Sequence, residues 1–471
     1  MKRGFYVGRF QPFHIGHLAA IKEMDKAPDL EQIVIGIGSS QYSNQLKNPF
    51  TAEERELMIR KTLDNLAMSK PYNIVKIPDI HDYPKWVLHV QELTPEFQVV
   101  YVPGSSIVQE LFKNARYEVR KPKVTHDISA TKVRQLMYSD HDWTEYVTPQ
   151  VVQLIEEVNG VNRLRAIAST LGIGKIDLSK ILVVPRLSKY EWDMREYKLG
   201  HDQLIEQYRR DGEDIGRILG SHSRQKESLE ELKMCLHESQ FIEADQLTRE
   251  IAKNAPLIIA LGGDDHFKYV SHFVDNNFIL GVNSDIVRSA GALTYFTPKG
   301  FDSVLIKLEK GEFYVEEWIR LQAEVNGSKK SPAVSEYYLG EINRRYISSH
   351  KLILSERSEE QKCSGLLVVT GSGSTGWYDS ANRYIFPNGN RVPKDEKFAR
   401  FLVTEPYRGR LSGYSMLEGI IEEGRELIVV SFNKHNGILS ADSIDDYGFK
   451  RGSVATIRIA DKPLKVISGV N

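Results

Sequence analysis

Short apolar runs alternate with longer amphipathic stretches through the first third of the chain. The pattern predicts buried strands at residues 4–7, 32–38, 72–77 and 97–102, with a helix over about 85–93 before the last of them. Unbroken apolar runs of this length are typical of strands in a parallel sheet that is covered on both faces. Strands that alternate with helices build a doubly wound α/β sheet, which binds its ligand at the carboxyl ends of the strands.

A second alternating pattern follows a join near residues 170–175, where the helical spacing stops. Apolar runs predict strands at 180–184, 257–261 and 279–282. A stretch of high, mixed charge between about residues 191 and 250 predicts solvent-facing helices. The second part of the chain is therefore also expected to be α/β where it begins.

The chain has 471 residues, more than one hydrophobic core usually supports, so we expect at least two domains. The first, a Rossmann-like parallel sheet, is expected over residues 1–172 and the second over 176–471. The second domain is expected to combine an α/β part, about 176–295, with a β-rich part, about 296–471, whose strand pattern continues from residue 401 to the end.

Composition and charge limit the classes of function. Lys and Arg total 62 against 63 for Asp and Glu, and a formal charge of −1 gives no electrostatic footprint for nucleic acid or a membrane surface. No apolar run approaches the length of a membrane span. Cys235 and Cys363 are the only cysteines, too few for a disulfide framework or a cysteine zinc site. Because the first strand is expected to start at the second or third residue, no room is left for a signal peptide, and we expect a cytoplasmic protein.

The first candidate site is the stretch GRFQPFHIGH, from Gly8 to His17, which follows the first predicted strand. A glycine-containing loop between a strand and a helix aims backbone N–H groups and the positive end of the helix dipole at one point, which favours a phosphate. His14 and His17 are three residues apart, so both imidazoles face the same side of the first helical turn. Arg9 adds a fixed positive charge. An H-x-x-H pair by itself is more often a polar helix face or a metal-binding pair.

A second stretch, ISATKVR ending at Arg134, carries similar chemistry. Ser129 stands where an N-cap belongs, and the following amides, the Thr131 hydroxyl and the Arg134 guanidinium can surround the β- and γ-phosphates of a nucleotide. As bare sequence the stretch is also simply a capped helix. Between the two stretches, NPFTAEER predicts another capped helix, with Thr51 as the N-cap and Glu54 completing a capping box.

These strings resemble the HxGH nucleotidylyltransferases, and together they are similar to the archaeal type of nicotinamide-mononucleotide adenylyltransferase over about residues 3–168. The resemblance implies that a phosphate oxygen of the mononucleotide attacks the α-phosphorus of ATP, with Mg²⁺ bridging the phosphates. It gives catalytic roles to His14, His17 and Arg134, which would supply positive charge and hydrogen-bond donors. It also implies a set of residues that bind substrate or ATP: Gly8, Arg9, Phe10, Trp86, Ser129 and Thr131.

Two points in this first domain stay open. The resemblance makes Trp86 the residue that stacks on the nicotinamide ring, but a core tryptophan on an amphipathic helix fits the sequence equally well. The rival activity is that of a cytidylyl or pantetheine-phosphate transferase, which carries the same HxGH. The full strings GRFQPFHIGH and ISATKVR favour the nicotinamide family.

Three strand-to-loop junctions carry the candidate chemistry of the second half. LIIAL leads into GGDDH, residues 262–266, where two glycines allow close backbone approach and Asp264 presents a carboxylate; a tight turn with solvent-facing acids explains this pentapeptide equally well. ILGVNSD places Asn283 and Ser284 after another strand. VVTGSGSTGW, residues 368–377, is a Gly/Ser loop of the kind that cradles phosphates or ribose hydroxyls, and the alternative is a flexible linker.

The three junctions resemble the NAD kinase family, most closely its mitochondrial-type branch, over most of residues 180–466. GGDDH stands where that family has G-G-D-G-T, and GVNSD stands where it has G-V-N-[ST]. The resemblance implies an NAD kinase-like α/β lobe followed by a β-rich lobe, with Asp264 as the general base that receives the proton of the 2′-hydroxyl of NAD. It implies these binding residues: Gly262, Gly263, Asp265, Asn283, Ser284, Glu341, Gly371, Ser374 and Thr375.

Two positions depart from that family pattern. Asp265 and His266 replace the small Gly and Thr that border the phosphates, and they are expected to add bulk and negative charge there. Gly340 replaces the Asn that precedes Glu341 in the family pattern. Both changes are compatible with an altered phosphate donor, or with a domain that binds NAD(P) without phosphorylating it.

The combined prediction is a bifunctional enzyme that makes NAD from nicotinamide mononucleotide and ATP and then phosphorylates it to NADP. Its expected partners are these small molecules, with Mg²⁺ accompanying ATP, with no nucleic acid or membrane, and with further copies of the chain in a homo-oligomer. One alternative keeps the adenylyltransferase and makes the second domain a non-catalytic NAD(P)-binding regulatory or assembly domain. Another is a lipid or sphingoid kinase, which shares the GGD element but is disfavoured by GVNSD and by the lack of a membrane-seeking patch.

Overall fold

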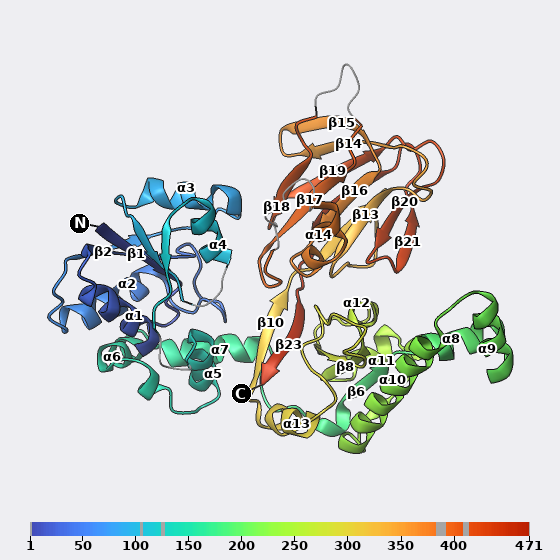
Figure 1. Ribbon diagram of the computed structural model, residues 1–471, viewed down its shortest axis with the longest axis horizontal. Coiled ribbons are helices and arrows are strands. Elements are labelled where there is room, and N and C mark those ends of the chain that lie inside the picture. The colour runs from blue at the N-terminus through green and yellow to red at the C-terminus, as the bar shows by residue number, and fades with distance from the viewer. Residues whose placement is uncertain (1, 104–106, 124–127, 383–391, 408–413, 471) are drawn as a thin grey trace. The chain divides into compact units, whose positions relative to one another are not determined.

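The computed structural model describes residues 2–103, 107–123, 128–382, 392–407 and 414–470 (Figure 1). These residues divide into two compact units, the first ending at Gly174 and the second running from Lys175 to Val470. None of the helices in the described ranges is both long and apolar enough to cross a membrane.

Unit 1 is built on a five-stranded sheet in which every neighbouring pair is parallel. In spatial order the strands are β3 (Tyr72–Lys76), β2 (Leu30–Ile37), β1 (Lys2–Gly8), β4 (Val99–Tyr101) and β5 (Glu118–Arg120). The strand order reverses between β1 and β4, and a doubly wound sheet opens its ligand crevice at the carboxyl ends of such a pair. The predicted doubly wound sheet is confirmed.

Helices cover both faces of this sheet (Figure 1). One face packs under α1 (Ile15–Lys26), α2 (Ala52–Asp64), α5 (Ala130–Tyr138), α6 (Pro149–Glu157) and α7 (Gly160–Thr170). The other face packs under α3 (Tyr83–Leu93) and α4 (Ile107–Asn114). The capping box predicted at the start of α2 is present, because Thr51 Oγ1 accepts from the N–H of Glu54 at 3.2 Å and the Glu54 carboxylate accepts from the N–H of Thr51 at 2.9 Å.

Unit 2 begins with a six-stranded mixed sheet. In spatial order its strands are β10 (Phe313–Trp318), β23 (Leu464–Val470), β9 (Phe278–Asn283), β8 (Leu257–Gly262), β6 (Leu182–Pro185) and β7 (Gln240–Phe241). Only the β10–β23 pair is antiparallel. The strand predicted from residue 180 begins at Leu182, because Asp177 caps a short 3-10 turn, η2 (Leu178–Lys180), by accepting from the N–H of Ser179.

The helices of this α/β part are α8 (Lys189–Tyr197), α9 (His201–Arg210), α10 (Ile215–Cys235), α11 (Arg249–Lys253), α12 (Asp264–Ser271) and α13 (Phe301–Lys310). Three of them, α8 to α10, fall in the charged stretch that was predicted to be helical. Strand β23 is the last strand of the chain yet lies inside the α/β sheet, so the chain passes from the α/β part to the β-rich part and back again.

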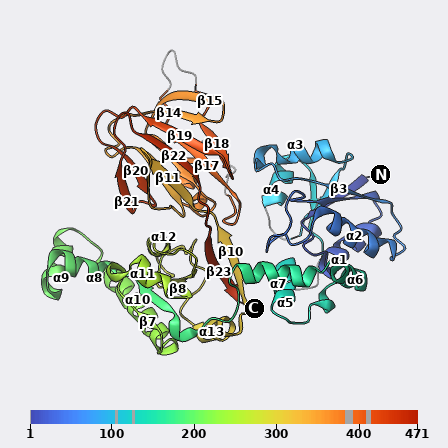
Figure 2. The ribbon, with the colours of Figure 1, turned by 180° about the vertical axis from the view of Figure 1, so that it is seen from behind.

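The β-rich part consists of two antiparallel six-stranded sheets that share one apolar core (Figure 2). The first sheet is β12 (Ser328–Lys329), β11 (Leu321–Val325), β22 (Val454–Ile459), β19 (Glu426–Ser431), β14 (Ser348–Leu354) and β15 (Arg357–Cys363). The second is β18 (Glu418–Glu422), β17 (Phe398–Thr404), β16 (Gly365–Val369), β13 (Glu336–Glu341), β20 (Gly437–Ala441) and β21 (Asp445–Gly448). The turn η4 (Ser372–Thr375) and α14 (Trp377–Asn382) follow β16. The predicted combination of an α/β lobe with a β-rich lobe is confirmed.

Candidate active sites

The first site forms where β1 ends and α1 begins. His14 is the N-cap of α1: its Nδ1 accepts from the N–H of Gly16 at 3.2 Å, and Nδ1 of His17 accepts from the N–H of His14 at 3.2 Å. The two rings stack, with centroids 3.6 Å apart and planes 24° from parallel. Because each Nδ1 accepts a hydrogen bond, a neutral ring carries its proton on Nε2. The pair therefore presents two Nε2–H donors side by side.

Burial keeps both imidazoles uncharged at neutral pH. Burial, together with the nearby charge of Arg134, lowers the pKa of His14 to about 4. Burial, and then its neighbour His14, lowers the pKa of His17 well below the ordinary value. The sequence assigned positive charge to the two histidines; in the structure they supply donors, and the fixed charge comes from Arg134.

Helix α5 brings Arg134 to the same place. The guanidinium donates to the carbonyl of Gln11 at 2.8 Å and to Thr131 Oγ1 at 3.2 Å, which ties α5 to the loop after β1. Ser129 is the N-cap of α5, as predicted, and its Oγ accepts from the N–H of Lys132 at 3.2 Å. The structure thus joins the two stretches that the sequence singled out, although more than a hundred residues separate them.

A buried arginine fixes the loops that follow β1 and β2 by hydrogen bonds to their carbonyl groups. Arg55 on α2 is fully buried, and its guanidinium donates to the carbonyls of Thr51, Arg9, Gly38 and Ser39 at 2.9–3.2 Å. These carbonyls belong to the segments that follow β1 and β2 and to the cap of α2. The stretch NPFTAEER was predicted to be a capped helix and part of the family resemblance, but no role was predicted for the arginine that ends it.

Two residues predicted to bind substrate lie in the core of unit 1. Phe10 is 1% exposed, and its ring packs edge-on against His17 with centroids 4.9 Å apart. Trp86 is 9% exposed and packs edge-on against Phe112 with centroids 5.6 Å apart. Phe10 therefore supports an imidazole of the site, while the stacking role of Trp86 stays a prediction. Gly8 ends β1, and the side chain of Arg9 is exposed beside it.

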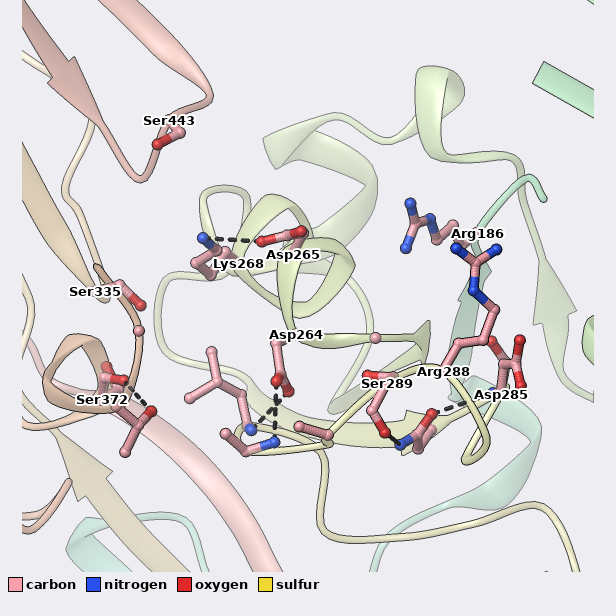
Figure 3. A pocket seen from close by; sticks show the side chains of 18 of the residues that line it. Arg186, Asp264, Asp265, Lys268, Asp285, Arg288, Ser289, Ser335, Ser372 and Ser443 are labelled. Carbon is pink, nitrogen blue, oxygen red and sulfur yellow. Dashed lines mark hydrogen bonds and ion pairs between the residues drawn. The ribbon is translucent and has the colours of Figure 1, made fainter. Parts of the chain in front are cut away.

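The second site is a cavity of about 700 Å³ within unit 2. It lies at the carboxyl ends of β6, β8 and β9 and is bordered on one side by loops of the β-rich part (Figure 3). Six residues predicted from the sequence line it: Gly263, Asp264, Asp265, Asn283, Ser284 and Thr375. Further charged side chains complete the lining: Arg186, Lys189, Lys268, Asp285, Arg288 and Glu336. Figure 3 shows Arg186 and Arg288 on one side, Asp264 in the middle, and Ser335 and Ser372 on the other side.

Asp264 faces this cavity at the first turn of α12. Its two carboxylate oxygens accept from the N–H of Ala292 at 3.0 Å and from the N–H of Leu293 at 2.7 Å. These bonds fix both the carboxylate and the loop that follows β9. Gly263 lies next to it, and a Cβ there would lie 2.9 Å from the Oγ of Ser289, so a larger residue would require this hydroxyl to move.

The polar groups after β9 are tied together. Asn283 Oδ1 accepts from the N–H of Asp285 at 3.1 Å, and its amide donates to the carbonyl of Ser289 at 3.3 Å. Asp285 accepts from Ser221 Oγ at 2.6 Å and from the Nε of Arg224 at 2.7 Å. Although burial alone would raise the pKa of Asp285, these bonds hold it below the ordinary value. Asp285 therefore anchors this wall as an ionised group.

The Gly/Ser loop divides into anchoring and lining positions. Ser374 is fully buried, and its hydroxyl bonds to the carbonyl of Gly371 at 2.7 Å and to the backbone of Val392. Both predicted residues, Gly371 and Ser374, thus fix the loop from within. Ser372, Gly373 and Thr375 line the cavity instead.

Asp265 and His266, the two residues of GGDDH that depart from the family pattern, point in different directions. Asp265 borders the cavity, is exposed, and pairs with Lys268 at 3.0 Å. His266 is turned away: its Nε2 lies 2.8 Å from the carbonyl of Val184, and burial lowers its pKa to about 4. The expectation that His266 adds bulk beside the phosphates is therefore wrong, because this side chain packs between α12 and β6.

Like His266, Glu341 points away from the cavity, and its carboxylate holds a backbone segment in place. It is 1% exposed, and its carboxylate accepts from the N–H groups of Lys434, His435 and Asn436 at 2.7–3.1 Å. It lies outside the cavity lining, and the acidic residue that β13 contributes to the cavity is Glu336. Sequence reasoning missed Glu336 because no motif surrounds it. For Arg186 a signal existed, since it lies two residues after the strand predicted at 180–184 and directly follows β6.

No three His, Cys, Asp or Glu side chains converge on a metal position anywhere in the described residues. Any magnesium at these sites would therefore depend on oxygen atoms of a bound nucleotide together with one or two carboxylates.

Comparison with known proteins covers both parts of the chain. Residues 5–136 match the cytidylyltransferase-like family model. The nicotinamide-nucleotide adenylyltransferase of Methanococcus maripaludis is 44% identical over 168 residues, which is 35% of this chain and 95% of the relative. The enzyme of the same name from Thermococcus onnurineus is 39% identical over 186 residues, 39% of this chain and 98% of the relative. The relative from Thermoplasma acidophilum is 43% identical over 171 residues, with shares of 36% and 93%.

Solved NAD kinases are structural neighbours for the rest of the chain. An NAD kinase from Archaeoglobus fulgidus in complex with ATP has a TM-score of 0.42 at 21% identity and covers 61% of this chain and 92% of that one. The yeast NADH kinase complexed with NADH has a TM-score of 0.41 at 15% identity, with shares of 49% and 66%.

The buried arginine gives a stability prediction. Arg55→Met keeps much of the apolar stem and removes all donors, so the carbonyls of Arg9, Gly38 and Ser39 lose their bonds to Arg55. We expect the free energy of unfolding of unit 1 to fall by about 3 kcal/mol or more in chemical denaturation of the full chain. The matched control is Arg60→Met on the same helix, whose guanidinium pairs with Glu56 on the surface; its loss should cost less than about 1 kcal/mol. Equal stability of the two variants would contradict the anchoring role.

Proposed function

The chain belongs, through its N-terminal part, to the nicotinamide-nucleotide adenylyltransferase family, and from this we propose that its first domain joins nicotinamide mononucleotide to the adenylyl group of ATP, forming NAD and pyrophosphate. We propose that its second domain then transfers a phosphoryl group to the 2′-hydroxyl of NAD, forming NADP. We assign the two activities to residues 1–172 and 176–471. The observation that carries the first activity is the stacked pair of His14 and His17 beside Arg134.

The first reaction needs no nucleophile from the protein. A phosphate oxygen of the mononucleotide attacks the α-phosphorus of ATP in line, and pyrophosphate leaves, so catalysis consists of positioning and of stabilising the negative charge that spreads in the transition state. The Nε2–H groups of His14 and His17 donate to phosphate oxygens, and Arg134 supplies the fixed charge. Donors that are already oriented cost no reorganisation when the reaction occurs.

The second reaction is supported by the cavity of unit 2. Parallel strands end at it, as they do in nucleotide-binding α/β folds. Its cationic side chains, Arg186, Lys189, Lys268 and Arg288, suit the phosphates of a nucleoside triphosphate and a dinucleotide. A carboxylate at this place would receive the proton of the attacking 2′-hydroxyl, and Asp264 is the residue that the sequence assigns to that role.

The carboxylates of the unit 2 cavity fit a magnesium ion that enters with ATP. Bound Mg²⁺ neutralises charge on the phosphates. In unit 2 Asp265 is the most exposed carboxylate of the cavity and would share in holding the ion. In unit 1 the residues of the site are histidines and arginine, which are poor ligands for Mg²⁺, so there the nucleotide phosphates would hold it. A cytoplasmic location and a homo-oligomer stay predictions from the sequence.

One observation favours the alternative in which the second domain binds NAD(P) without phosphorylating it. Both oxygens of Asp264 already accept backbone N–H groups, so this carboxylate is engaged in holding the loop at Ala292 and Leu293. If no other group accepts a proton, the cavity is a binding site only. Such a domain would regulate the adenylyltransferase or drive assembly.

A single assay tests the two activities together. The purified chain is incubated with nicotinamide mononucleotide, ATP and Mg²⁺, and NAD and NADP are separated by chromatography over time. We expect NAD to rise first and NADP to follow. Accumulation of NAD without NADP, even with excess NAD and several phosphate donors, would establish the binding domain instead.

The stacked pair gives a kinetic prediction. His17→Ala removes one Nε2–H donor and should lower the rate of NAD formation on the order of a hundredfold. Formation of NADP from supplied NAD provides the internal control, since His17 lies outside the second domain, and it should not change. Near wild-type NAD formation by a folded variant would remove His17 from the catalytic groups.

The carboxylate at the cavity gives a second prediction. Asp264→Asn replaces one of two acceptor oxygens with a donor, which faces a backbone N–H and releases the loop at Ala292 and Leu293. We expect NADP formation from supplied NAD to fall on the order of a hundredfold, while NAD formation from the mononucleotide is unchanged. An unchanged rate of NADP formation would show that Asp264 neither reacts nor shapes the cavity.

A further inference from the structure

Lys394 contacts the loop that holds Asp264, although its side chain lies outside the lining of the unit 2 cavity. Its Nζ donates to the carbonyl of Ala292 and, at 3.2 Å, to the hydroxyl of Tyr295. The ammonium group also lies over two aromatic rings, 4.4 Å from the centroid of Tyr295 and 5.0 Å from that of Trp318. Charge-assisted hydrogen bonds and cation–π contacts together give this half-buried cation a fixed place.

The bond to Ala292 reaches Asp264 through a single peptide unit. The carbonyl of Ala292 and the N–H of Leu293 belong to the same planar, trans peptide group, so they point in opposite directions. The carbonyl accepts from Lys394, while the N–H donates to Oδ1 of Asp264 at 2.7 Å. Because hydrogen bonds in a chain polarise one another, a cation on the carbonyl oxygen makes the N–H a stronger donor to the carboxylate.

The segment that carries Lys394 is bound to the Gly/Ser loop. The hydroxyl of Ser374 bonds to both the N–H and the carbonyl of Val392 at 3.1 Å. Gly371 packs so closely against the segment that a Cβ there would lie 2.1 Å from the carbonyl oxygen of Pro393 and 2.8 Å from the Cα of Lys394. Lys394 therefore links a loop at one side of the cavity to the carboxylate in the middle of it (Figure 3).

The other groups that face the ammonium come from β10, α12 and the loop after β9. Glu316 of β10 accepts from the hydroxyl of Tyr295 at 3.0 Å and from Nε1 of Trp318 at 2.7 Å. Burial lowers the pKa of Lys394 below its ordinary value, and the charges of Glu316 and Asp264 oppose this without cancelling it. Burial also raises the pKa of Tyr295, so this phenol stays neutral. Lys394 is thus a cation at neutral pH that loses its charge more readily than an exposed lysine under alkaline conditions.

We propose that Lys394 is a positioning residue of the second domain, which orients the Asp264 carboxylate through the peptide unit of Ala292 and Leu293 and ties it to the Gly/Ser loop. This role rests on the proposed phosphorylation of NAD, and it leaves Asp264 as the group that receives the hydroxyl proton. A carboxylate accepts about four hydrogen bonds, so the two backbone bonds of Asp264 leave acceptor positions for that proton.

The first test is steady-state NADP formation from supplied NAD, ATP and Mg²⁺ by the full chain. Lys394→Met keeps most of the stem and removes the ammonium, so the carboxylate is less well oriented and kcat should fall about tenfold or more. KM for NAD should change by less than about threefold, because Lys394 lies outside the cavity lining. Lys397→Met, in the same segment and exposed to solvent, is the matched control and should keep the wild-type kcat.

A double-mutant cycle with Asp264→Asn shows whether Lys394 acts through Asp264. If it does, Lys394→Met should have little further effect once the carboxylate is gone, and the double variant should keep the kcat of Asp264→Asn within about twofold. A lysine that only stabilised the fold of unit 2 would lower kcat by the same factor in both backgrounds.

The pH profile gives a readout that does not depend on how Lys394→Met folds. As the pH rises through the pKa of Lys394, the ammonium loses its charge and with it the stronger, charge-assisted bond to Ala292. The wild-type kcat should then decline toward that of Lys394→Met. Arginine stays protonated in proteins, so Lys394→Arg should lack this alkaline decline whatever its rate at neutral pH. The same decline in both proteins would overturn the proposal.

The outcomes separate the role from the function. Absence of NADP with the wild type overturns the phosphorylation and the role of Lys394 together. NADP formation by the wild type with an unchanged kcat in Lys394→Met overturns the role alone. Equal effects of Lys394→Met in the two backgrounds of the cycle, or a raised KM at an unchanged kcat, likewise overturn it.

Discussion

Backbone groups at the end of a buried strand must find hydrogen-bond partners, and in both units of this protein buried charged side chains supply them. In unit 1 the guanidinium of Arg55 binds four carbonyls from the ends of β1 and β2 and the cap of α2. In unit 2 the carboxylate of Asp442 accepts from three consecutive N–H groups at the start of β13. A charge buried without partners would be strongly destabilising, so these residues and their loops depend on each other. The side chains of the two candidate sites therefore extend from backbone segments whose rearrangement would cost free energy.

The features predicted correctly from the sequence are those whose physics is local. The cap at Thr51, the cap at Ser129 and the shared face of His14 and His17 each depend on residues two or three positions apart. The doubly wound sheet followed from apolar runs of strand length. Arg55 and Asp442 were missed because their partners are mostly distant in sequence, up to 46 residues away for Arg55 and up to 170 for Asp442. No periodicity or short motif contains that information.

The resemblance to known families pointed to loops that line the cavity of unit 2, but not to which residues of these loops face it. In the Gly/Ser loop Ser374 is turned inward and Thr375 faces the cavity, although the two are adjacent. In GGDDH the same division separates His266 from Asp265. Loop conformation decides which side chain meets a ligand, and that conformation depends on tertiary contacts such as the bond between His266 and the carbonyl of Val184. Substitution of a small family residue by a large one therefore does not by itself block a site.

Burial acts on the titratable groups of both sites in the same direction, by favouring the uncharged form. It lowers the pKa of His14 to about 4 and raises that of Glu336 to about 7. Neutral imidazoles avoid the cost of desolvating two adjacent cations, yet they still offer donors to an anionic phosphate. A bound phosphate would in turn favour the protonated imidazole, so charge complementarity grows as negative charge gathers on the ligand. A buried titratable group that is neutral at rest can change its protonation when charge develops nearby, whereas a fixed ion pair cannot.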